Sequence, residues 1–189
     1  MRELYLECYS GISGDMTVAA LLDLGVPGEY LMKELKKLHL DGYEIKISRT
    51  KKNQITATDF DVILKDEHKD EHGHEHAHTH VNDEDVKECH EQEHSHEHTH
   101  VHNSYREIKE FILASELSDR VKKMILKIFQ VIAEAEAQVH GTAVDEVHFH
   151  EVGAVDSIVD ISAAAISLDY LGFDSIVTSE IWEGKGHVW

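Results

Sequence analysis

Two regular patterns of apolar and polar residues run along this chain, and together they predict short strands and longer helices. Apolar residues at every second position predict strands at Tyr43–Arg49 and Thr56–Leu64. The polar connection between them, Thr50–Ile55, has the length of a hairpin loop, so we expect these two strands to pair antiparallel. Further strands are expected at Leu4–Tyr9, Val144–His150 and Ser175–Ile181.

Apolar residues spaced three or four apart predict helices elsewhere. Ser13 and Gly25 are capping residues at the two ends of a first helix, Pro27 suits the start of a second, and Ser104 with Glu107 forms a capping box. The expected helices span about 14–24, 27–38 and 118–139, a segment from Ser104, and an alanine-rich, buried segment at 154–171. The residues expected to face the core are Leu31, Leu35, Leu38, Ile108, Phe111, Ile112, Val121, Ile125, Ile128, Ile132, Ala135 and Val139.

These elements predict an α+β fold in which helices pack on a small mixed sheet. Residues 66–103 break the pattern, because they are rich in His, Glu, Asp, Thr and Lys and almost lack apolar side chains. Such a segment cannot bury enough apolar surface to offset the entropy of ordering, so we expect a disordered, His-rich, metal-binding insertion. Residues 1–65 and 104–189 are then expected to form one domain around it.

The charge of the chain is strongly acidic, with a net value of −19 for 189 residues. Residues 65–102 hold twelve acidic side chains and three lysines, so nearly half of this charge lies near the insertion. An acidic surface repels phosphates, so neither nucleic acid nor a membrane is an expected partner. Two cysteines without a C-x-x-C pair, no apolar signal segment and no membrane-spanning run predict a cytoplasmic protein.

The insertion contains twelve of the seventeen histidines in alternating runs such as HGHEHAHTH. Neutral imidazole is a good ligand for Ni(II), Zn(II), Cu(II) and Co(II), and so many flexible ligands suit metal storage or delivery better than catalysis. The alternative is a solvated loop that binds metal only adventitiously. The predicted metal ligands here are His68, His72, His74, His76, His78, His80, His90, His94, His96, His98, His100 and His102.

A second candidate site is HFHEVGAVDSIVDI, residues 148–161. On a strand, His148 and His150 would share one face, and Glu151 would follow them at the strand's end. Asp156 and Asp160 lie four apart on the next helix and share a face there. Two imidazoles and up to three carboxylates could therefore hold one metal ion or accept a proton. The alternative is a pair of partly exposed histidines and an aspartate favoured by the helix dipole.

A third candidate is the glycine-containing turn CYSGISGDM, residues 8–16, between the first strand and the first helix. Free backbone N–H groups at such a turn suit a phosphate, although the carboxylate of Asp15 opposes an anion unless a cation lies between them. The alternative is ordinary helix capping. The predicted contacts to a phosphorylated ligand are Ser10, Gly11, Ser13, Gly14 and Asp15.

The chain resembles the nickel-insertion protein of nickel-pincer cofactor biosynthesis (the LarC family) through three features in order. These are YLECYSGISGDMTVAALLDLG near the N-terminus, the internal histidine-rich segment, and HFHEVGAVDSIVDI. The resemblance covers nearly all of the chain outside the insertion and implies that it is the N-terminal part of such a protein, truncated at its C-terminal end.

This resemblance implies nickel insertion into pyridinium bis-thiocarboxylic acid mononucleotide, a lyase-type cyclometallation that gives the cofactor of lactate racemase. It also implies use of CTP with Mg or Mn, at a C-terminal domain or partner chain, and lactate racemase apoenzyme as a further partner. Formation of a nickel–carbon bond releases a ring proton, which His148, His150 or Glu151 could accept. The alternatives are a non-catalytic nickel chaperone or store and a metal-dependent hydrolase.

Overall fold

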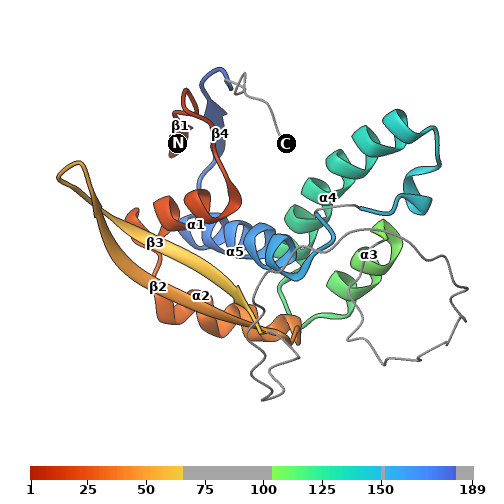
Figure 1. Cartoon of the computed structure of the whole chain (residues 1–189), viewed down its shortest axis with the longest axis horizontal. Coiled ribbons are helices and arrows are strands. Elements are labelled where there is room, and N and C mark those ends of the chain that lie inside the picture. The colour runs from red at the N-terminus through yellow and green to blue at the C-terminus, as the bar shows by residue number, and fades with distance from the viewer. Residues whose placement is uncertain (66–103, 150–151, 182–189) are drawn as a thin grey trace, which may run out of the picture.

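The computed structural model describes residues 1–65, 104–149 and 152–181 (Figure 1). The strands are β1 (Glu3–Leu6), β2 (Tyr43–Lys52), β3 (Ile55–Leu64) and β4 (Ser175–Thr178). The helices are α1 (Gly14–Asp23), α2 (Gly28–Leu35), α3 (Tyr105–Ala114), α4 (Asp119–His140) and α5 (Val155–Leu171), with short 3-10 turns η1 (Lys36–Leu38) and η2 (Val144–Glu146). The predicted α+β class is confirmed, whereas the expected disorder of the insertion lies outside the described residues.

The described strands form two separate sheets rather than one small mixed sheet. β1 pairs in parallel with β4, from Glu3 opposite Ser175 to Leu6 opposite Thr178. β2 and β3 form the predicted antiparallel hairpin. In Figure 1 the β1–β4 pair stands at the top of the view, and the hairpin runs along the left side, below α1. Parallel and antiparallel pairing were both expected, but their separation into two sheets is a tertiary feature that local patterns do not encode.

The hairpin has a tighter turn than the sequence suggested. Its strands continue to Lys52 and Ile55, so only Asn53 and Gln54 form the loop. Both have positive φ values, 48° and 69°, as a two-residue hairpin turn requires. The predicted loop Thr50–Ile55 is therefore mostly strand, because polar side chains are compatible with the ladder where it faces water.

Helix α5 is the centre of the core, as predicted. It contacts α1, α2, α4 and β3. Ile158, Val159 and Ala163 are fully buried on it, and Ser162 and Ser167 are fully buried as well. Since its buried side chains include several small ones, neighbouring helices can approach closely from more than one side.

The buried face of α4 differs from the predicted one in its C-terminal half. Its buried residues are Val121, Ile125, Phe129, Ala133 and Ala137. Ile128 and Ile132 are only half-buried, Ala135 is exposed, and Val139 is 81% exposed. The true spacing is four residues throughout, and each such step advances the stripe by about 40° around the helix. The stripe therefore winds as α4 passes α3, α5 and η2.

The strand predicted at Val144–His150 is wrong. Residues 144–146 curl into η2, and His148 forms one isolated antiparallel bridge with Ser104. Val147 and Phe149 are buried while His148 is exposed, so the predicted alternation holds over these three residues. Within the described residues, the pairing partner here is the single residue before α3, which supports one bridge instead of a ladder.

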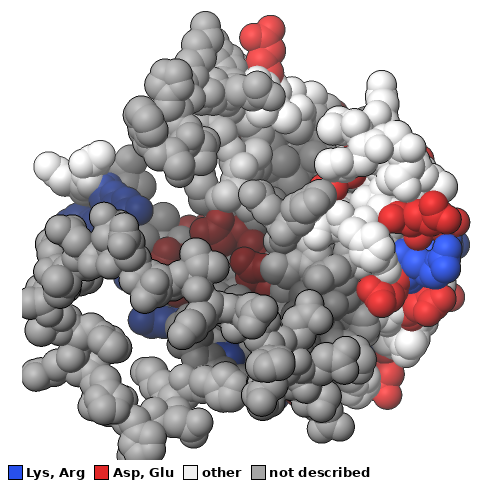
Figure 2. All heavy atoms as spheres, turned by 45° about the vertical axis from the view of Figure 1, so that its right-hand side comes forward, with Lys and Arg blue, Asp and Glu red and all other residues white. Residues whose placement is uncertain are grey.

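The surface carries mixed charge on the face drawn in Figure 2, where acidic side chains flank a small group of basic ones. Among the described residues, no helix is long and apolar enough to cross a membrane. The expectations about nucleic acid, membranes and a cytoplasmic location remain predictions.

Candidate functional site

The glycine-containing turn follows the carboxyl end of β1 and is fixed by its neighbours. Cys8 is buried, and its backbone N–H donates to the hydroxyl of Ser179 at 2.7 Å, just beyond the end of β4. Gly11, with φ +84°, donates its N–H to the carbonyl of Cys8 at 3.1 Å. The turn thus lies beyond the carboxyl ends of two parallel strands, the usual position of ligand sites in parallel sheets.

Helices α1 and α5 meet at Gly14 and Asp160. A Cβ atom added to Gly14 would lie 2.8 Å from the Cβ and 2.9 Å from the Cγ of Asp160. Contacts below about 3.0 Å between such carbon atoms do not occur in relaxed packing. Glycine at the first position of α1 is therefore what allows the Asp160 carboxylate to approach the start of that helix.

The Asp160 carboxyl is unusually hard to ionise. Burial is the main cause, followed by the negative charges of Asp15 and Asp156, and together they raise its pKa from 3.8 to about 6, although the backbone N–H of Asp15 opposes the shift by hydrogen bonding. Its Oδ1 is buried and has no hydrogen-bond partner within the described part of the chain. A buried carboxylate oxygen of this kind is stabilised by a proton or by a cation.

The remaining turn residues bring negative charge to the start of α1 and provide no side-chain cap. Ser13 occupies the N-cap position of α1, but its side chain caps no N–H; its hydroxyl donates to the carboxylate of Asp15 instead. The Asp160 carboxylate already accepts the N–H of Asp15. A bare phosphate at this helix start would face two carboxylates, so an anion fits there only through a bridging cation.

His148 lies in a different part of the molecule from what the spacing suggested. It lines a hollow of about 290 Å³ together with Ser104, Arg106, Glu107, Asp145 and Glu146. Within residues 1–65, 104–149 and 152–181, no group of three His, Cys, Asp or Glu side chains is placed to hold a metal ion. The described structure therefore does not gather His148 with Asp156 and Asp160. His150, Glu151 and all twelve histidines of the insertion lie outside the described residues.

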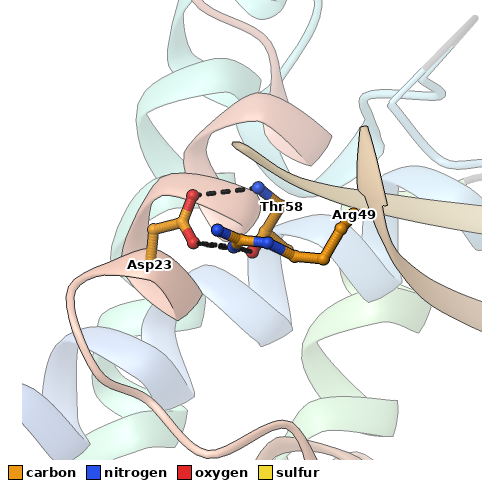
Figure 3. A network of polar contacts seen from close by, with 3 residues as sticks. All are labelled: Asp23, Arg49 and Thr58. Carbon is orange, nitrogen blue, oxygen red and sulfur yellow. Dashed lines mark hydrogen bonds and ion pairs between the residues drawn. The ribbon is translucent and has the colours of Figure 1, made fainter. Parts of the chain in front are cut away.

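A polar network that sequence reasoning missed ties α1 to the hairpin (Figure 3). The Asp23 carboxylate accepts the backbone N–H of Thr58 at 2.9 Å and its hydroxyl at 2.8 Å, and it pairs with the guanidinium of Arg49. These bonds lower the pKa of Asp23 to about 2, and the hydrogen bond from the Thr58 N–H contributes most to the shift. A cleft of about 380 Å³ lies beside this network, between α1 and the hairpin.

The contact of Gly14 with Asp160 has a partial signal in the sequence, whereas the contact of Asp23 with Thr58 has none. Gly14 at a helix start and Asp160 within an apolar helix are both visible as anomalies, although nothing in one sequence pairs them. The partnership of Asp23 with Thr58, 35 residues away, leaves no such signal.

Comparison with known proteins gives a consistent family. The family model described as nickel insertion protein matches residues 4–189. A pyridinium-3,5-bisthiocarboxylic acid mononucleotide nickel insertion protein of Clostridium acetobutylicum is 56% identical over 100% of this chain and 45% of its own length. Proteins of the same name from Alkaliphilus metalliredigens and Clostridium kluyveri are 50% and 48% identical, over 99% and 100% of this chain and 41% and 42% of their own lengths.

The chain thus spans less than half the length of these curated relatives. No solved structure matches it.

Proposed function

The chain belongs to the nickel insertion protein family, and from that premise we propose that it takes part in inserting nickel into pyridinium-3,5-bisthiocarboxylic acid mononucleotide. The observation that carries this proposal is the match over residues 4–189, together with relatives of that name that are about half identical to the chain. Nickel is the substrate ion of this reaction, not a resident cofactor.

The histidine-rich segment 66–103 is proposed to bind Ni(II) and deliver it. Its imidazoles are numerous, and the alternation in the sequence lets neighbours share an ion without imposing one geometry. Such a segment supplies capacity, while residues 1–65 and 104–189, proposed to form one N-terminal domain, would supply the surface for the mononucleotide.

The chemical step is proposed to use groups near the start of α5. Making a nickel–carbon bond requires a base for the ring proton, and His148, His150 and Glu151 are the proposed acceptors. Asp156 and Asp160 are proposed to contact the metal, and the unpartnered Oδ1 of Asp160 supports this role. Ser10, Gly11, Ser13, Gly14 and Asp15 are proposed to contact the phosphate end of the mononucleotide through a bridging cation.

Energy and partners are proposed to come from outside this chain. CTP with Mg or Mn would act at a C-terminal part or partner chain, so the segment described here is not proposed to insert nickel alone. Lactate racemase apoenzyme would receive the finished cofactor.

A second candidate function is nickel storage or chaperoning without chemistry. It is favoured by one observation, namely that the described residues gather no three metal-binding side chains. Under this function the insertion would account for all nickel handling by the chain.

Replacement of residues 66–103 by a Gly/Ser linker separates the two functions. Insertion into the mononucleotide is measured by mass spectrometry with excess nickel and with the remainder of a full-length family member supplied. A protein that inserts nickel keeps its insertion activity after the replacement when nickel is in excess. A protein that only stores nickel loses all of its nickel binding. The matched control replaces only the twelve histidines with serine and keeps the length.

A further inference from the structure

The cleft between α1 and the hairpin is large enough to hold a small ligand. Its volume is about 380 Å³, and its walls come from α1 on one side and both hairpin strands on the other. Small-molecule sites typically enclose about 300–1,000 Å³. The cleft therefore has room for one mononucleotide or for its ring and sugar.

The walls of the cleft combine three kinds of side chain. Met16 provides apolar surface, since it is 56% exposed although it is large and apolar, whereas Phe60 lines the cleft but is buried. Asp15 and Asp59 bring carboxylates, and Lys52 brings an ammonium group at the hairpin tip. Thioether sulfur packs well against flat rings, carboxylates attract a cationic ring, and an ammonium group pairs with anionic substituents.

A polar network also joins the two walls of the cleft. Asp23 on α1 accepts two hydrogen bonds from Thr58 on β3 and pairs with Arg49 on β2 (Figure 3). Both Asp23 and Thr58 line the cleft. A site with fixed walls spends less binding free energy on ordering its own side chains.

We propose that this cleft binds the pyridinium ring of the mononucleotide, with the ring against Met16 and with Lys52 paired to one of its thiocarboxylates. This inference rests on the proposed function, which supplies the ligand, and it concerns binding of the mononucleotide and not the chemical step, because none of His148, Asp156 and Asp160 lines the cleft. A pyridinium ring is a flat cation with anionic substituents, so it matches an apolar wall flanked by carboxylates and one lysine. Asp15 belongs both to the cleft and to the glycine-containing turn, so the phosphate end can reach that turn from the same pose.

Methyl NMR tests the contact at Met16, and the Lys52 variant then distinguishes the cleft from a second hollow, beside the glycine-containing turn, that Met16 also lines. The chain has four methionines, and Met16 lines the cleft, whereas Met32 lies on α2 and Met124 on α4. The probe is pyridinium-3,5-dicarboxylic acid mononucleotide, the oxygen analogue of the substrate. We expect the Met16 methyl signal to shift saturably while those of Met32 and Met124 stay in place. An unmoved Met16 signal at saturation, or no binding at all, would overturn the inference.

A charge reversal at the hairpin tip tests the role of Lys52. Lys52→Glu should weaken the affinity for the same probe about tenfold, as measured by calorimetry. Lys46→Glu is the matched control, because it makes the same change on the same strand, six residues from Lys52 and outside the cleft. It should change the affinity less than about twofold. Equal weakening by both variants would indicate a general charge effect and overturn the proposed pairing.

The same samples distinguish this inference from the proposed function. If nickel insertion proceeds while the Met16 signal is unmoved, the cleft assignment falls and the function stands. If the probe shifts Met16 and depends on Lys52 but no nickel is inserted, the cleft assignment stands and the function falls.

Discussion

Gly14 and Asp160 touch so closely that a Cβ at position 14 would lie 2.8 Å from the Cβ of Asp160. The contact joins the start of α1 to α5, the central helix of the core. It brings three aspartates, Asp15, Asp156 and Asp160, near enough for their charges to act on one another. The candidate site therefore depends on a glycine that makes no chemical contribution of its own.

Gly14→Ala should destabilise the protein by about 1–3 kcal/mol, because the added methyl group forces α1 and α5 apart. Urea unfolding monitored by circular dichroism measures the change. Gly28→Ala is the matched control: Gly28 is also the first residue of a helix, but its added Cβ would meet only the mobile end of Ile47 at 3.2 Å. Equal destabilisation by the two variants would contradict the close contact at Gly14.

Because of Asp160, the free energy of unfolding should fall as the pH rises from about 4 to about 6. Its pKa in the folded protein, about 6, exceeds its ordinary value of 3.8, so the folded state holds the proton more tightly between these values. The contribution is complete below pH 3.8 and is lost as the pH passes 6. Asp160→Asn cannot ionise, so thermal unfolding should lose this dependence and the variant should be more stable than wild type at pH 7.

Asp156→Asn serves as the comparison on the same helix. Asp156 is exposed, and its charge is one of the causes that raise the pKa of Asp160. The variant should keep the dependence but move it to lower pH, as carboxyl NMR of Asp160 would record. An unchanged titration of Asp160 would show that the two carboxylates do not interact.

Asp23→Ala should lower the free energy of unfolding by about 1 kcal/mol. The effect is small because the ion pair of Asp23 with Arg49 is partly exposed and screened by solvent. Hydrogen exchange of the Thr58 N–H, which donates to Asp23, should become faster. Because the pKa of Asp23 is lowered to about 2, its contribution is present above pH 3.8 and disappears as the pH falls through 2. Asp61→Ala, an exposed aspartate on the same strand, should leave the exchange of Thr58 unchanged.

Replacing both His148 and His150 with alanine should abolish nickel insertion by the chain combined with the rest of a full-length protein. The melting temperature should be preserved, because His148 is exposed and its backbone bridge to Ser104 does not need the ring. Insertion is measured by mass spectrometry, with His140→Ala on α4 as the control. Retained turnover in the double variant would remove both histidines as proton acceptors.

Local patterns predicted most elements of the described fold because they are local consequences of sequence. The capping box at Ser104 and Glu107 forms as expected, and Gly141 and Gly172 end their helices in the left-handed conformation. The predictions that were wrong depend on partners far along the chain. The segment from Val144 to His150 has the composition of a strand, but among the described residues it forms only one bridge. The buried residues of α4 are determined by the elements that pack against it and not by the apolar pattern of the helix alone.

The candidate site was only partly predictable for the same reason. Sequence reasoning identified the turn at Ser10–Asp15 and the pair Asp156 and Asp160, but it placed His148 with them. The structure instead joins the turn to α5 through Gly14 and Asp160 and leaves His148 in another hollow. Which side chains meet across helices is set by packing, which one sequence does not specify.

The most direct test of the proposed function is nickel transfer to the thiolated mononucleotide. The chain is loaded with Ni(II), mixed with the mononucleotide, the remaining part of a full-length family member, CTP and Mg, and the product is read by mass spectrometry. We predict a nickel-containing mononucleotide that appears only when this chain, the remaining part of the family member and CTP are all present. The same yield with this chain left out, or no metallated product from the complete mixture, would contradict the account.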